Sequence, residues 1–210
     1  MSQSLYQQLK NGRMLPLMEE FYTIQGEGYH TGKPAYFVRI GGCDVGCSWC
    51  DTKRSWNADI HPAVATDDVV QRAVATAGKA VVVTGGEPSM YELDYFTKQL
   101  HKHQIQTFIE TSGAHQLSGD WDWICLSPKR QIPPKNEIFS RAHELKMIVQ
   151  EEIDLDWAEE NAKKVKVDCE LYLQPEWSVA PKILPVIIEY AKHNPKWKIS
   201  LQSHKYMKIP

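Results

Sequence analysis

The chain has 210 residues, which suits a single domain (residues 1–210) with a sizeable hydrophobic core. Hydrophobic residues make up 42% of it, charged residues make up 24%, and the formal net charge is −2, so we expect neither a nucleic-acid partner nor an anionic membrane partner. It contains no apolar stretch of membrane-spanning length and no apolar signal core near its start, so we expect a cytosolic protein.

Strand-like and helix-like segments alternate along the chain after a polar N-terminal arm over residues 1–18. Short runs of β-branched, aliphatic and aromatic residues predict strands, and apolar residues spaced three and four apart predict helices. Thr66 is a candidate cap for the first helix. The expected strands cover residues 35–40, 79–88 (running into a glycine turn), 106–113, 123–129, 143–149, 170–175 and 198–203, and the expected helices cover residues 67–78, 90–102, 156–165 and 180–193.

This alternation is typical of a parallel sheet, in which apolar strands are covered by amphipathic helices. The connections over residues 114–122 and 130–142 are too short for full helices. We therefore expect an α/β fold, an abbreviated and incomplete parallel (β/α) barrel. The polar, glycine-containing motifs all follow the carboxyl ends of strands, the edge where such folds place their sites.

A loop over residues 43–52 carries three of the five cysteines. The spacing of Cys43, Cys47 and Cys50 is C-x3-C-x2-C, and thiolates close together on a glycine-containing loop suit an iron–sulfur cluster. Three ligands for a four-iron cluster leave one iron open, and that iron can chelate the amino and carboxyl groups of a ligand. In a reducing compartment such a group of cysteines favours metal binding over disulfides.

Two other interpretations of this loop remain open at the level of the residues. One is a structural zinc site with a fourth ligand elsewhere, such as His61. The other is an electron carrier in which Cys125 or Cys169 is the fourth cluster ligand. Both of these cysteines stand alone in apolar stretches, however, so we expect them to pack in the core.

The segment CDVGCSWCDT resembles the cluster loop of the radical S-adenosylmethionine (SAM) superfamily. Read with TIQGEG before it and TGGEP after it, the chain from residue 18 to its end resembles the 7-carboxy-7-deazaguanine synthase family. The resemblance implies a barrel of radical SAM type, a [4Fe–4S] cluster, SAM as a regenerated cofactor, and Mg²⁺. It further implies a lyase that converts 6-carboxy-5,6,7,8-tetrahydropterin to 7-carboxy-7-deazaguanine with release of ammonia, in the biosynthesis of deazapurines such as queuosine.

The same resemblance implies which residues contact the substrate and Mg²⁺. Arg39 is expected to hold the substrate carboxylate, which its forked donors suit, and Thr84 is expected to contact the substrate. Thr52 is expected to contact Mg²⁺, and the terminal Pro210 is expected to reach the substrate. The TIQGEG segment is expected to line the pterin with Ile24, Gln25, Gly26 and Glu27.

The SAM contacts that the resemblance implies fall on turns at strand ends. Gly86 and Glu87 belong to the glycine-rich motif that pairs with the methionine amino group of SAM, and Ser112 follows the next strand. Two interpretations of His204 stay open, a residue that faces the site and an ordinary surface or core histidine, of which we favour the second. The remaining contacts are Ser127, Pro128 and Lys129 for the ribose and carboxylate, and Gln174, Pro175, Glu176 and Trp177 for the adenine.

The family resemblance also implies a homodimer and an external electron donor, a flavodoxin or a ferredoxin, alongside the small-molecule pterin substrate. Three rival hypotheses remain. Another radical SAM enzyme, such as a glycyl-radical activase, would give no reason for TIQGEG. An iron–sulfur or zinc binding module would lack catalysis. A plain α/β domain would keep its function without the three cysteines.

Overall fold

The computed structural model describes residues 3–210, so the first two residues of the predicted arm lie outside the described residues. Its centre is a nine-stranded sheet with the order β3-β1-β2-β4-β5-β6-β7-β8-β9. Neighbouring strands from β2 to β9 are parallel, whereas β1 is antiparallel to both β2 and β3. The strands are β1 (Met14–Ile24), β2 (Pro34–Ile40), β3 (Ala63–Ala65), β4 (Ala80–Gly85), β5 (Gln106–Thr111), β6 (Trp123–Leu126), β7 (Glu144–Val149), β8 (Glu170–Pro175) and β9 (Trp197–Ile199).

Helices connect most of the parallel strands, and none among residues 3–210 is long and apolar enough to cross a membrane. They are α1 (Gln3–Lys10), α2 (Thr66–Val74), α3 (Asp94–Lys102), α4 (Asn136–Phe139), α5 (Ile153–Ala162), α6 (Ala180–His193) and α7 (Ser203–Met207). Single 3-10 turns follow several strands at Lys53–Ser55, Ala58–Ile60, Pro88–Met90 and Trp177–Val179.

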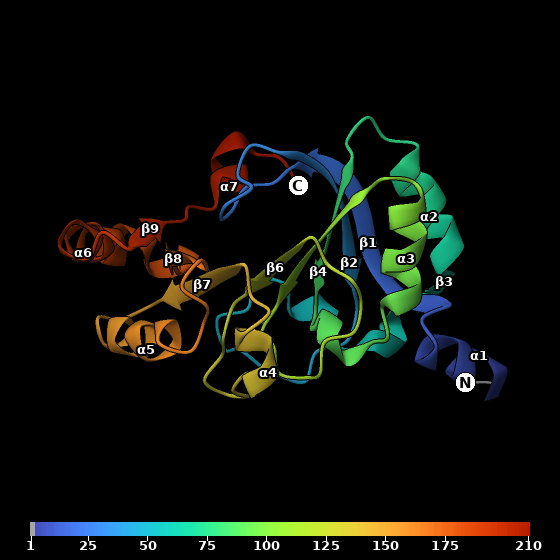
Figure 1. The fold of residues 1–210 in the computed structure, drawn as a ribbon, viewed down its shortest axis with the longest axis horizontal. Helices are drawn as coiled ribbons and strands as arrows, with labels where there is room; N and C mark the ends of the chain where they lie inside the picture. The colour runs from blue at the N-terminus through green and yellow to red at the C-terminus, as the bar shows by residue number, and fades with distance from the viewer. Residues whose placement is uncertain (1–2) are drawn as a thin grey trace.

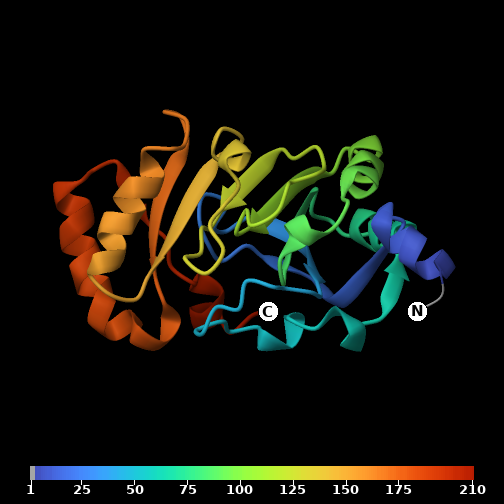
Figure 2. The same cartoon turned by 90° about the horizontal axis from the view of Figure 1, so that it is seen from below.

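The sheet curves, and helices α2, α3, α5 and α6 lie along its outer side, whereas α7 lies beside the loop that follows β1 (Figures 1 and 2). Helices α2 and α3 pack against one another at the β1 end of the sheet, while α5 and α6 pack on β7, β8 and β9 at the other end. Within residues 3–210 the outermost strands β3 and β9 do not pair with each other, so the barrel is incomplete. This is the abbreviated (β/α) barrel that the sequence predicts.

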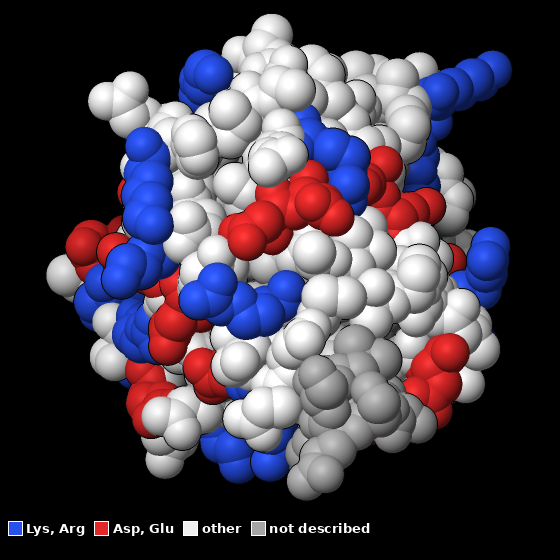
Figure 3. Space-filling view, turned by 90° about the vertical axis from the view of Figure 1, so that its right-hand side faces the viewer, with Lys and Arg blue, Asp and Glu red and all other residues white. Residues whose placement is uncertain are grey.

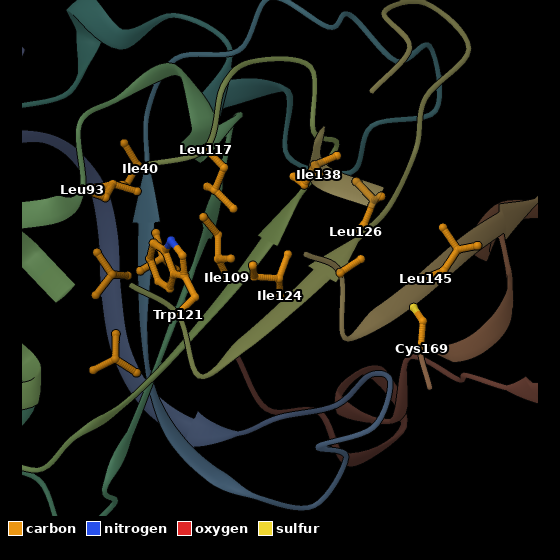
Figure 4. Close-up of a cluster of buried hydrophobic side chains, with 14 of the residues drawn as sticks. Ile40, Leu93, Ile109, Leu117, Trp121, Ile124, Leu126, Ile138, Leu145 and Cys169 are labelled. Carbon is orange, nitrogen blue, oxygen red and sulfur yellow. The ribbon is translucent and has the colours of Figure 1, made fainter. Parts of the chain in front are cut away.

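The main hydrophobic core fills the layer between the sheet and the helices. Alternate residues of each parallel strand point into it, as Val81 and Val83 do from β4, while Val82 faces the inner side. Strands buried on both faces are continuously apolar, which explains the run of valines. Figure 4 shows one part of this layer, where Trp121 and Leu117 pack over the side chains of β5 and β6.

The end of the molecule that carries α1, α2 and α3 has a mixed charge. Figure 3 shows Lys and Arg side chains interspersed with Asp and Glu side chains over this face. Ion pairs such as Arg72 with Glu20, 2.5 Å apart, bring opposite charges together at this end. Mixed charge of this kind suits a solvated surface.

The seven predicted strands are confirmed as β2 and β4 to β9, and the four predicted helices as α2, α3, α5 and α6. The last strand ends earlier than predicted, at Ile199, because Ser203 begins a helix instead. The two short connections are confirmed, since the first has no helix and the second has only the four-residue α4. The elements missed by the sequence are α1, β1, β3, α4 and α7.

Two local predictions were wrong. Residues 1–18 were expected to form a polar arm, but Met14–Ile24 is a strand that pairs with β2 over seven positions. Thr66 was expected to cap α2, but the cap residue is Ala65, and the Thr66 hydroxyl donates to the carbonyl of Gly12 at 2.6 Å. The same helix ends at Val74, well before Gly78.

Candidate active site

A cavity of about 470 Å³ lies on the inner side of the sheet, at the carboxyl ends of the parallel strands. Paired residues of neighbouring strands lie side by side on its wall. Arg39 of β2 is paired with Thr84 of β4, and Ile148 of β7 is paired with Gln174 of β8. Its walls hold every residue that the sequence predicted for the site except Pro128. They are Ile24, Gln25, Gly26, Glu27, Arg39, Cys43, Cys47, Cys50, Thr52, Thr84, Gly86, Glu87, Ser112, Ser127, Lys129, Gln174, Pro175, Glu176, Trp177 and Pro210.

The cysteine loop leaves β2 and is tied to the end of β4 by backbone hydrogen bonds. The Gly86 N–H donates to the carbonyl of Ile40, and the Glu87 N–H donates to the carbonyl of Gly42, both at 2.8 Å. A Cβ on Gly86 would lie 2.0 Å from the Gly42 oxygen, so only glycine permits this approach. The glycine-rich turn therefore fixes where the cysteine loop begins.

Glu87 holds the ends of β4 and β5 together. Its buried carboxylate accepts hydrogen bonds from the N–H and hydroxyl of Ser89, the Thr111 hydroxyl, and the N–H and hydroxyl of Ser112. A carboxylate offers about four lone-pair sites, so five donors occupy it fully. Glu87 lines the cavity, but its carboxylate is hydrogen-bonded to neighbouring segments of the protein and stabilises the fold there.

The three loop cysteines line one wall of the cavity, with the apolar side chains of Val45 and Ala114 packed among them. Burial raises the pKa of Cys43, and it raises the pKa of Cys47 against the opposing charge of Lys129. A buried thiol of this kind becomes a thiolate most readily when a metal replaces its proton.

The remaining cysteines are absent from this cavity. Cys125 and Cys169 are buried in the interior, as the sequence predicted, and burial raises the pKa of both thiols. The alternative with a fourth cysteine ligand therefore has no support from the fold. The Nε2 of His61, the residue considered as a fourth zinc ligand, donates to the carbonyl of Arg54 at 2.8 Å, which counts against this nitrogen as a metal ligand.

The opposite side of the cavity carries a buried charge cluster. The Lys146 ammonium lies 2.6 Å from Glu27 and 3.1 Å from Glu110. Glu27 also accepts hydrogen bonds from Gln202 at 2.9 Å and Gln174 at 3.1 Å. Burial favours a higher pKa for Glu27, but Lys146 and these hydrogen bonds outweigh it and lower the pKa to about 2.

Arg39, on β2, is paired with Glu19 of β1 and lines the same cavity. Its Nε donates to Glu19 at 2.7 Å in an ion pair of the fold, and Arg39 also lines the cavity, as the predicted ligand role requires. The pairing uses Nε and leaves the terminal N–H groups available. The rings of Phe21 and Phe37 stack beside it with centroids 5.5 Å apart, and both line the cavity. They add an apolar wall on which a flat ring can lie.

The segments predicted to bind SAM form a third part of the wall. The Lys129 ammonium donates to the carbonyl and hydroxyl of Ser127 at 2.5 and 2.7 Å and lies 5.5 Å from the centre of the Trp49 ring. Burial lowers the pKa of this lysine. Glu176 accepts the N–H of Ser178 at 3.0 Å, which shapes the turn that carries Trp177.

The C-terminal segment closes one side of the cavity. The N–H and hydroxyl of Ser203 both donate to the carbonyl of Gly26, at 2.9 and 2.8 Å. His204 lines the cavity against Gly26, contrary to the expectation of an ordinary histidine, and burial lowers its pKa. Lys205 reaches Asp51 at 3.4 Å and lies over the ring of Trp177.

Several lining residues were not predicted from the sequence. Most come from elements that the sequence missed, or they are ordinary strand residues whose partners lie far away along the chain. The two charged residues Glu144 and Lys146 in the short strand-like run HELKMIV were the one local signal that could have found Lys146. The lining residues that were not predicted include Phe21, Phe37, Trp56, Lys146, Ile148, Gln202 and Lys205.

A curved, mostly parallel sheet with three cysteines on one loop at its carboxyl edge defines a radical SAM enzyme. Residues 37–122 match the model of the Radical SAM superfamily. The chain is 54% identical over 202 residues to the 7-carboxy-7-deazaguanine synthase of Flavobacterium psychrophilum, covering 96% of each protein. It is 42% identical over 197 residues to the synthase of the same name from Synechocystis, covering 92% of this chain and 93% of that one.

A solved structure has the same fold. The crystal structure of QueE from Escherichia coli aligns with a TM-score of 0.81 and 32% identity, covering 95% of this chain and 98% of that chain. The chain therefore belongs to the 7-carboxy-7-deazaguanine synthase family, within the radical SAM superfamily.

The cofactors of this enzyme are a [4Fe–4S] cluster and SAM. The residues present fit them. Cys43, Cys47 and Cys50 face one cavity without a fourth cysteine, which leaves one iron without a protein thiolate. The same cavity extends past Gly86 and Lys129 and has room for a ligand larger than the cluster alone.

Proposed function

We propose that this enzyme converts 6-carboxy-5,6,7,8-tetrahydropterin to 7-carboxy-7-deazaguanine with release of ammonia, as a carbon–nitrogen lyase of deazapurine (queuosine-type) biosynthesis. The observation that carries the proposal is that one cavity holds the three cysteines and also a second region, the substrate end, whose side chains are charged or apolar. That end has an ionised carboxylate at Glu27, the side chain of Glu110, a guanidinium at Arg39, and an apolar wall.

The substrate roles are assigned by chemistry. A pterin presents adjacent N–H donors on its pyrimidine edge, which the carboxylates can accept, while the terminal N–H groups of Arg39 suit the carboxylate at C6. Thr84 is beside Arg39 in the sheet and is positioned to contact the same part of the substrate. Ile24, Gln25 and Gly26 complete this end, and Pro210 is a further proposed substrate contact.

The proposed cofactor contacts lie on the other walls of the cavity. When bound, the cluster and SAM supply a carbon radical that removes hydrogen from the substrate. The chain contributes the thiolates of Cys43, Cys47 and Cys50, and the backbone of Gly86 at the closest approach of the two loops. Glu87 positions that turn. The other SAM contacts proposed are Ser112, Ser127, Pro128, Lys129, Gln174, Pro175, Glu176 and Trp177.

A Mg²⁺ ion is proposed at Thr52. Its hydroxyl lies 3.0 Å from the carboxylate of Asp51, and both residues line the cavity beside the last cysteine. Mg²⁺ keeps several waters and needs few protein oxygens, so one or two such groups suffice.

We further propose residues 1–210 as a single cytosolic domain that forms a homodimer and receives electrons from a flavodoxin or ferredoxin. The single sheet with its one main core supports a single domain. The five cysteines are all free thiols, which suits a reducing compartment and supports the cytosolic location. Sedimentation of the cluster-loaded protein tests the homodimer, and reduction by a flavodoxin or by a ferredoxin tests the electron donor.

Anaerobic turnover tests the proposed function. Reconstituted enzyme is mixed with SAM, a reductant, Mg²⁺ and 6-carboxytetrahydropterin, and the products are identified by mass spectrometry. We expect 7-carboxy-7-deazaguanine from the unmodified enzyme and none from Cys50→Ala. Reductive cleavage of SAM without this product would retain the radical chemistry and refute the substrate, which is the result that a glycyl-radical activase would give.

A further inference from the structure

Lys146 is a buried lysine in the middle of β7, and only 4% of its side chain is exposed. A charge in such a place destabilises the fold unless opposite charges and hydrogen bonds compensate it. Here two carboxylates do so, those of Glu27 and Glu110. Neither is a sequence neighbour of the lysine, since they lie 119 and 36 residues away.

These three groups connect the separate segments that form the substrate end. Glu27 belongs to the loop after β1, Glu110 to β5 and Lys146 to β7. Gln25 donates to Glu110 at 2.9 Å, and Gln202 and Gln174 donate to Glu27. Glu27 therefore accepts three hydrogen bonds and Glu110 accepts two, which leaves lone pairs on both carboxylates for a ligand.

The cluster as a whole is anionic, with two carboxylates and one ammonium. The other ionisable groups around it are Cys125 on β6, Glu144 on β7, Lys129 after β6 and His204 on α7. Burial favours a lower pKa for Lys146, but the surrounding acids outweigh it and raise the pKa well above its usual value. Burial lowers the pKa of His204, so near neutral pH it remains uncharged.

We propose that Lys146 is a positioning residue for substrate recognition, which holds the carboxylate of Glu27 ionised and fixes the orientation of both Glu27 and Glu110 so that they accept the N–H edge of the pterin. The inference rests on the proposed function. An ionised carboxylate offers only acceptors, whereas a protonated one offers a donor that would oppose the substrate's own N–H groups. Without Lys146, burial raises the pKa of Glu27, so the carboxyl gains a proton as the pH falls.

Three variants test this role. Lys146→Met keeps the length of the side chain and removes the charge, and Lys146→Arg keeps the charge. Lys196→Met is the matched control, because Lys196 also pairs with a glutamate, Glu159 at 2.5 Å, but lies outside the cavity. Each cluster-loaded protein is titrated with 6-carboxypterin, the fluorescent oxidised analogue, between about pH 6 and about pH 9, and with SAM, and its iron content is measured. Turnover of 6-carboxytetrahydropterin by the unmodified enzyme is measured alongside.

We expect Lys146→Met to bind 6-carboxypterin at least about 30-fold more weakly at neutral pH, with affinity falling further as the pH falls. Iron content and SAM affinity should match those of the unmodified enzyme and of Lys196→Met. Lys146→Arg should restore the flat pH profile of the unmodified enzyme.

Two results would overturn the inference while the unmodified enzyme still turns over the pterin. The first is unchanged, pH-independent binding of 6-carboxypterin by Lys146→Met. The second is an equal loss of iron, SAM binding and pterin binding, which would reduce Lys146 to a purely structural residue. Absence of both binding and turnover in the unmodified enzyme would instead refute the proposed function and the inference with it.

Discussion

Replacing Glu87 by glutamine changes one atom of the most heavily hydrogen-bonded side chain at the cavity edge. One carboxylate oxygen accepts from both groups of Ser89 and from Thr111, and the other accepts from the N–H and hydroxyl of Ser112. In Glu87→Gln the amide NH₂ must replace one of these oxygens. The less damaging orientation directs it at Ser112, whose hydroxyl can rotate but whose N–H can only donate.

The cost has two parts. The Ser112 N–H loses its acceptor inside the protein, which costs about 1 to 3 kcal/mol. The three bonds to the retained oxygen change from charge-assisted to neutral, at about 0.5 to 1 kcal/mol each. The sum is about 2.5 to 6 kcal/mol, and for a chain of this size each kcal/mol lowers Tm by about 2 to 4 °C. Glu87→Gln is therefore expected to lower Tm by at least about 5 °C.

Thermal unfolding of the cluster-free protein under reducing conditions, followed by circular dichroism, measures this effect without interference from cluster loss. Glu176→Gln is the matched control, because Glu176 also caps a short turn through a serine two residues later, but accepts only from that serine. We expect it to lose about 1 kcal/mol. A Tm for Glu87→Gln within about 3 °C of the unmodified protein, or equal to that of Glu176→Gln, would refute the reasoning.

Three further predictions concern other parts of the structure. Cys125→Ala is expected to keep the brown colour and full iron content, because its thiol lies outside the main cavity; loss of iron would indicate a fourth ligand. Gly26→Ala places a Cβ 2.4 Å from the His204 ring, so the C-terminal segment should be displaced and trypsin should cleave it faster than in the unmodified protein; an unchanged rate counts against this contact. Burial opposes ionisation of Glu159, but hydrogen bonds from its partners outweigh burial and lower the pKa of Glu159 below 4.5. The Glu159 carboxylate therefore stabilises the fold above that pH, and this contribution disappears as the pH falls through the lowered pKa. Urea unfolding should therefore give a gap of about 1 kcal/mol between Glu159→Gln and the unmodified protein at neutral pH that closes in acid, and a pH-independent gap would contradict the assignment.

Much of the fold was predictable because its signals are local. The apolar run of β4, the amphipathic spacing of α6 and the spacing of the three cysteines each depend on residues close together in the chain. Parallel strands also share one orientation, so motifs that follow different strands must meet at one edge. For this reason nearly all predicted site residues line one cavity, although their individual roles remain predictions.

The elements that the sequence missed depend on distant partners. The segment Met14–Ile24 contains a proline and two glutamates and has no clear alternation, but its pairing with β2 makes it a strand and stacks Phe21 on Phe37. Helix α7 has five residues, too few to be stable alone, and the carbonyl of Gly26 holds its first turn.

The sequence by itself determined the fold class, the cluster loop and the edge of the sheet that carries the site, since all three follow from local spacing and from the direction of parallel strands. Only the tertiary structure decided the charge state of the substrate end. In the sequence Lys146 is one of two charged residues in a short strand, and its role depends on Glu27 and Glu110, which chain folding brings to it. The energy of a buried charge depends on what lies within a few ångströms, and no local pattern records those neighbours.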